Sequence, residues 1–143
     1  MGLPAPRGVK LLEHTADMGL ALRGPEVETV FRRSLDGLLL LLGLEQEGRG
    51  DGKELRLQIS APDNASLLVA WLNELLFHIQ ARQFRPCAIT ILHIKSGTLS
   101  AMITGSSGQD STTPAREVKA ATYHRLRFAK VGGSYRARVY FDL

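Results

Sequence analysis

The chain has 143 residues, of which 44% are hydrophobic, and its formal net charge is +4. This size fits one domain with a sizeable core, and we expect residues 1–143 to form a single domain. No segment approaches the ~20 consecutive apolar residues that cross a bilayer, and the first residues lack the apolar run of a signal peptide. We therefore expect a soluble, cytoplasmic protein. Cys87 is the single cysteine, which excludes an internal disulfide and a thiolate zinc site, and its apolar neighbours favour burial.

A polar cluster lies near the N-terminus between two apolar segments, "VKLLEH" and "MGLALRG", that have strand character. Its members are Glu13, His14, Thr15 and Asp17. We expect these side chains at the turn or the strand ends, where they can reach water. On residue chemistry alone, such groups more often cap a turn or form local hydrogen bonds than bind a ligand.

Two amphipathic helices are predicted, over about residues 25–42 and 63–82. Pro25 marks the start of the first helix and Gly43 its end, and Asp63 caps the second. The second helix carries a wide apolar stripe that includes Trp71, which favours packing across the face of a sheet. We expect Trp71 to be buried.

The remaining segments favour strands. Residues 55–60 alternate apolar and polar side chains, as a half-buried strand does. Residues 87–105 predict a hairpin with its turn at Gly97, and residues 117–143 predict a second hairpin that turns at Gly132 and Gly133. A polar loop over 106–115 joins them. The predicted fold class is α+β, with the two helices packed on a largely antiparallel sheet.

Side-chain alternation along the last hairpin predicts a basic outer face, provided that no bulge shifts the phase. The inner set includes Ala120, His124 and Phe128. The outer set contains four arginines and two tyrosines among Lys119, Tyr123, Arg125, Arg127, Arg136, Arg138, Tyr140 and Asp142. Such a face suits contact with phosphate or with an acidic protein patch, although arginines on a hairpin are commonly just solvated.

Four blocks occur in the order and spacing of the archease family, which the sequence resembles from about Lys10 to Leu143. They are "LEHTADMGLALRG", "LLVAWLNELLF", "VKAATYH" and "YRARVYFDL". The resemblance implies a non-catalytic accessory protein of the RtcB-type tRNA-splicing ligase. Such a protein promotes attachment of GMP to the ligase's own histidine, supports repeated turnover and relaxes which nucleoside triphosphate is accepted. RNA would be reached indirectly, through the ligase.

The resemblance also implies a metal site formed by Asp17, Asp142 and Leu143, with Leu143 contributing its α-carboxylate. Three carboxylates brought together repel one another unless a cation joins them, and an all-oxygen set suits a hard ion. Calcium is expected, with magnesium or manganese as alternatives. The residues implied to support the metal or to face the ligase are Glu13, His14, Thr15, Lys119, Tyr123 and His124.

Two other functions compete with this interpretation. A small basic RNA-binding domain could act directly on RNA through the arginine face, but such modules interleave aromatic and basic residues on one surface, and here aromatics are only 6% of residues. An enzyme that pairs Asp17 with His14 or His124 is less favoured, because the sequence supplies no obvious nucleophile, phosphate loop or oxyanion site.

Overall fold

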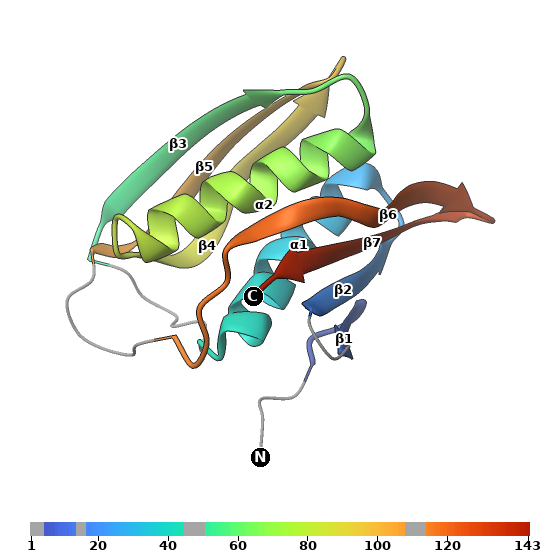
Figure 1. The fold of residues 1–143 in the computed structure, drawn as a ribbon. Coiled ribbons are helices and arrows are strands. Elements are labelled where there is room, and N and C mark those ends of the chain that lie inside the picture. The colour runs from blue at the N-terminus through green and yellow to red at the C-terminus, as the bar shows by residue number, and fades with distance from the viewer. Residues whose placement is uncertain (1–4, 14–16, 45–50, 108–113) are drawn as a thin grey trace.

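Two helices lie between two antiparallel sheets in the computed structural model of the protein (Figure 1). The structure describes residues 5–13, 17–44, 51–107 and 114–143. The four-stranded sheet has the order β1 (Val9–Glu13), β2 (Asp17–Gly24), β7 (Ser134–Asp142), β6 (Ala120–Val131), and the three-stranded sheet has the order β3 (Lys53–Ser60), β5 (Thr98–Ser107), β4 (Phe84–Lys95). Among the described residues, no helix is long and apolar enough to cross a membrane.

The helices α1 (Val27–Leu42) and α2 (Asn64–Gln80) confirm the predicted α+β class. Helix α1 packs on β1 and β2 of one sheet and on β4 of the other, while α2 packs on β6 and on β3 and β4. Because both helices are apolar on more than one side, each covers a sheet on either side of it. The strands therefore divide into two sheets, a division that the sequence pattern alone does not predict.

The helix ends follow the predicted signals with small shifts. Helix α1 begins at Val27 rather than at Pro25, and it ends at Gly43, whose φ of 74° is the left-handed conformation that glycine accepts most readily. At the start of α2 the Asp63 carboxylate accepts a hydrogen bond of 2.7 Å from the backbone N–H of Ser66. That bond holds the pKa of Asp63 below its ordinary value, since it favours the charged form.

The core forms where the helices meet the two sheets. Trp71 is fully buried, as predicted, and its indole N–H donates a 2.9 Å hydrogen bond to the Ser34 hydroxyl of α1. That hydroxyl in turn donates to the carbonyl of Phe31 at 2.6 Å. The chain of bonds satisfies the polar atoms of both side chains inside the core. Cys87 is also buried, as expected.

Both predicted hairpins are present. Strands β4 and β5 are joined at Ser96 and Gly97, and β6 and β7 at Gly132 and Gly133, with positive φ at three of these four positions. The intervening loop predicted over 106–115 lies mainly in residues 108–113, outside the described part of the chain.

The predicted side-chain alternation of β6 fails at Ala120 and His124, because this strand is irregular. Its register against β7 shifts between Thr122 and Arg127, so that residues on either side of the irregularity follow opposite parity. Ala121 pairs with Phe141 on the inner face, which places Ala120, predicted to be inner, on the outer face. His124, also predicted to be inner, is exposed.

Candidate functional site

The first residue of β2 and the last residue of β7 stand side by side. Asp17 and Asp142 are direct partners in the antiparallel register of these strands, and Leu143 follows Asp142 as the last residue of the sequence. Directly opposed side chains on one face have Cβ atoms about 4.5–5.5 Å apart. The sheet thus brings together two of the three predicted metal ligands from opposite ends of the sequence. We call Asp17, Asp142 and Leu143 the carboxylate cluster.

Strand β6 borders the cluster on the other side. Ala120 pairs with Asp142, and the backbone N–H of Lys119 donates a 2.8 Å hydrogen bond to the Asp142 carbonyl. The side chain of Ala120 is small, so the row Asp17, Asp142, Ala120 leaves the two carboxylates uncrowded. Lys119 is exposed beside them, where the sequence predicted a supporting or partner-facing residue.

The aspartates of the cluster have no ion-pair partner among the described residues. Like charges directly opposite each other in a sheet are destabilising. Within the described part of the chain, neither Asp17 nor Asp142 forms an ion pair. The described residues also contain no group of three His, Cys, Asp or Glu side chains placed to hold a metal, and the third predicted ligand, the α-carboxylate of Leu143, is not a side chain. Asp17 is half-buried and the other two residues are exposed, which suits an all-oxygen site open to solvent or to a partner.

The other predicted residues lie at varying distances from the cluster. Glu13 is exposed at the end of β1, opposite Met18. His14 and Thr15 lie outside the described residues. Tyr123 and His124 lie in the irregular segment of β6, where Tyr123 is 65% exposed.

Tyr140 forms the next row of the sheet and corrects the sequence prediction. The alternation places it on the solvated outer face, yet it is only 4% exposed. Its partner in β2 is Gly19, and a Cβ at that position would lie 2.7 Å from a ring carbon of Tyr140. Because Gly19 has no side chain, the ring packs onto the sheet, and the His124 ring meets it edge-on with centroids 6.3 Å apart.

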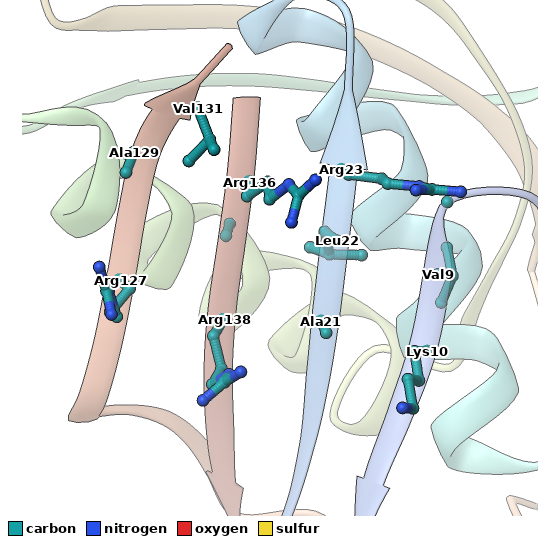
Figure 2. A pocket seen from close by; sticks show the side chains of 12 residues that line it. Val9, Lys10, Ala21, Leu22, Arg23, Arg127, Ala129, Val131, Arg136 and Arg138 are labelled. Atoms are coloured by element: carbon teal, nitrogen blue, oxygen red, sulfur yellow. The ribbon is translucent and has the colours of Figure 1, made fainter. Parts of the chain in front are cut away.

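Beyond Tyr140 the same face carries a concave basic surface, which we call the arginine groove (Figure 2). Its cavity volume is about 510 Å³. The residues that line it are Gly8, Val9, Lys10, Ala21, Leu22, Arg23, Arg127, Ala129, Val131, Arg136, Ala137 and Arg138. Three of the four predicted outer arginines line this groove; Arg125, in the irregular segment of β6, does not.

Lys10 and Arg23 are the two cations of the groove that the sequence prediction missed. The predicted outer face includes only residues of the last hairpin, whereas these two residues come from β1 and β2. The same period-two pattern is present there, since Arg23 follows the buried Leu20 and Leu22 at outer parity. The sequence pattern does not reveal that β2 pairs with β7, and this pairing is what brings Arg23 beside the arginines of the last hairpin.

The comparisons with known proteins give one consistent result. Residues 10–143 match the model of the Archease protein family (MTH1598/TM1083). The chain belongs to the archease family. The protein archease of Methanosarcina mazei is 30% identical over 137 residues, covering 92% of this chain and 93% of that protein, and the protein archease of Methanothermobacter thermautotrophicus is 28% identical over 140 residues, covering 96% and 99%.

Solved archease structures share the fold. The solution structure of Methanobacterium thermoautotrophicum protein 1598 superposes with a TM-score of 0.73 at 27% identity, covering 95% of this chain and 99% of that one. The crystal structure of an archease from Thermotoga maritima, described as a possible chaperone, gives a TM-score of 0.64 at 23% identity, with 94% and 96% covered. The archease match includes every residue of the carboxylate cluster and the cationic residues of the groove. One face of this archease therefore offers oxygen donors for a hard cation at one end and guanidinium groups for an anion further along.

Proposed function

We propose that this archease activates an RtcB-type tRNA-splicing RNA ligase in the cytoplasm and catalyses no reaction itself. It promotes attachment of GMP to the ligase's own histidine, allows the ligase to turn over repeatedly and broadens its choice of nucleoside triphosphate. The observation that carries the proposal is the direct pairing of Asp17 with Asp142. These residues belong to the two most widely separated blocks of the family pattern, and the fold joins them at one exposed end of a sheet.

We further propose that the carboxylate cluster binds a divalent cation, most simply Ca²⁺, with Mg²⁺ or Mn²⁺ as alternatives. The support is chemical: two opposed carboxylates without a cationic partner in the described part of the chain, followed by a third at Leu143. Oxygen donors of this kind suit hard cations, and Ca²⁺ tolerates irregular and partly solvated coordination. A bound cation would supply positive charge at the surface that meets the ligase.

The residues around the cluster then have roles toward the partner. Lys119 is fixed beside Asp142 through its backbone N–H, and its exposed side chain is available to an acidic group of the ligase. Tyr123 and His124 extend the exposed surface on the irregular segment of β6, and Glu13 does so on β1. His14 and Thr15, between Glu13 and Asp17 in sequence, complete the set proposed to support the cation or contact the ligase.

Guanylylation of the cognate ligase tests this function. Ligase would be incubated with labelled GTP at limiting concentration, with this archease or with an unrelated basic protein of similar size as the control. We expect the archease alone to raise both the rate of the first guanylylation and the number of RNA ligation turnovers per ligase. If neither quantity changes with the cognate ligase, the proposed function is wrong.

A further inference from the structure

The cations of the arginine groove are arranged in two neighbouring rows across the sheet (Figure 2). In one row Arg127 of β6 stands directly opposite Arg138 of β7. In the next row Arg136 of β7 stands directly opposite Arg23 of β2. Lys10 of β1 lies at the end of the first row, because it pairs with Ala21 of β2, which in turn pairs with Arg138. Five cations from four strands therefore share one concave face.

This arrangement has an energetic cost that the fold does not explain. Like charges directly opposite each other on neighbouring strands destabilise a sheet, and here two such pairs lie in adjacent rows. No carboxylate lines the groove, and none of its five cations forms an ion pair within the part of the chain that the structure describes. An anion bound in the groove would relieve both repulsions at once.

We propose that the arginine groove binds the phosphate backbone of single-stranded RNA directly. The guanidinium group is a planar fork that donates two hydrogen bonds to phosphate oxygens, and four of the five cations are arginines. The two rows are two residues apart along their strands, or about 6.8 Å. That interval is comparable to the spacing of consecutive phosphates on an extended strand, so each row can hold one phosphate group or more.

The lining favours nucleic acid over an acidic protein segment. Protein interfaces depend on buried aromatic or large aliphatic anchors, whereas the surface between these cations consists of small side chains such as Ala21 and Ala129. Val131, at the edge of the groove, is its one exposed large hydrophobic residue. No lining side chain is aromatic, so the groove offers no stacking platform for bases, and the proposed contacts are to phosphates alone, which should make the binding independent of RNA sequence.

The groove and the carboxylate cluster lie along the same face of the sheet. Along β2 the outer face runs from Asp17 through Gly19 and Ala21 to Arg23, so the carboxylate cluster and the first basic row are about 13 Å apart. An RNA strand held by the rows can therefore point toward the cluster. Binding by the isolated protein does not depend on the ligase, so its failure would leave the proposed activation of the ligase untouched.

The test is fluorescence polarisation of a labelled single-stranded RNA of about 12 nucleotides, within the usual site size of such surfaces. The full-length protein would be titrated at several salt concentrations between about 50 and 200 mM. The double variant Arg136→Gln, Arg138→Gln removes one arginine from each row. We expect its RNA affinity at low salt to fall by at least about tenfold, and its salt dependence to become less steep by about 0.7 for each phosphate that it no longer neutralises.

A matched control removes the same charge elsewhere. Arg56 and Lys95 are exposed on the three-stranded sheet, and Arg56→Gln, Lys95→Gln changes the net charge equally. This control should bind RNA as the wild type does. Both double variants should fold. The melting temperature of Arg136→Gln, Arg138→Gln, the groove variant, should be no lower than that of the wild type, because the two opposed like-charge pairs are absent from it.

Three results would overturn the proposal. The first is wild-type affinity in the groove variant, and the second is an equal decrease in the control, which would assign binding to net charge. The third is an oligoglutamate peptide of equal charge that displaces the RNA as well as unlabelled RNA does, which would identify a docking site for an acidic protein segment.

Discussion

Extending the chain beyond Leu143 is expected to weaken calcium binding by at least about tenfold. Metal affinity falls by that factor even when the mutated residue only forms a hydrogen bond to a metal ligand. The extension converts the α-carboxylate of Leu143 into a neutral amide and places new residues beside Asp17 and Asp142. One of the three proposed oxygen donors is thereby removed. Isothermal titration with Ca²⁺ measures the change in affinity, and the ligase assay should show a parallel decrease in activation.

The position of the added residues separates this effect from a general effect of a tag. The same tag at the N-terminus leaves all three carboxylates in place and should leave calcium affinity unchanged. Deletion of Leu143 is a harsher control, since it moves the free α-carboxylate onto Asp142 and disturbs the pairing with Asp17. Equal calcium affinity in the two tagged proteins would show that Leu143 is not a ligand.

Replacing Trp71 by alanine should destabilise the protein by about 3–5 kcal/mol. The side chain is fully buried between the helices and the sheets, so its removal leaves a cavity and ends the hydrogen bond to Ser34. Domains of this kind are stable by only about 5–15 kcal/mol, so the variant should be close to unfolding at 37 °C. Urea denaturation followed by circular dichroism measures the change, because Trp71 is the only tryptophan and its fluorescence disappears with it.

Two variants divide this effect into packing and hydrogen bonding. Ser34→Ala leaves the buried indole N–H without its partner and should cost about 1–3 kcal/mol. Trp71→Phe removes the N–H while retaining an aromatic ring, and the Ser34 hydroxyl still donates to Phe31, so it should cost less than Trp71→Ala. If the free energy of unfolding of Trp71→Ala lies within about 1 kcal/mol of the wild-type value, the described packing of α2 against α1 is wrong.

Local signals account for the parts of the fold that the sequence predicted well. The helices have apolar side chains at helical spacing, a capping Asp63 and a terminal Gly43, and the two hairpins have glycines in their turns. These features act within a few residues of one another, so a local pattern suffices to identify them. The partition of the strands into two sheets depends on which side of each helix a strand covers, which no local pattern contains.

The errors in the predicted outer face have two physical causes. The predicted alternation fails at His124 because extra residues in β6 shift its phase against β7 between Thr122 and Arg127. It fails at Tyr140 because the burial of a ring depends on its cross-strand neighbour, and Gly19 leaves room for the ring to pack flat. Neither the irregularity nor the neighbour is visible in the residues of the last hairpin alone.

The candidate site was likewise predictable only in part from the sequence. The set Asp17, Asp142 and Leu143 follows from the family resemblance, and the pairing of β2 with β7 explains how residues so far apart in sequence meet. The alternation predicts three of the five cations of the arginine groove, because Lys10 and Arg23 join the arginines of β7 and β6 through pairings that link the two ends of the chain. Both surfaces depend on the placement of β7 between β2 and β6.

The calcium dependence of ligase guanylylation, measured with wild-type protein and with Asp17→Asn, tests most directly whether a cation on the carboxylate cluster makes this archease an activator. The substitution keeps the shape of the side chain and removes one anion, so the variant should fold normally. We expect the midpoint of activation to match the calcium affinity measured by titration, and both to shift to higher calcium by the same factor, at least about tenfold. Glu54→Gln, on the three-stranded sheet, should shift neither. Full activation by folded Asp17→Asn at the calcium concentration that suffices for the wild type, or full activation by the wild type in excess chelator, would contradict the proposal.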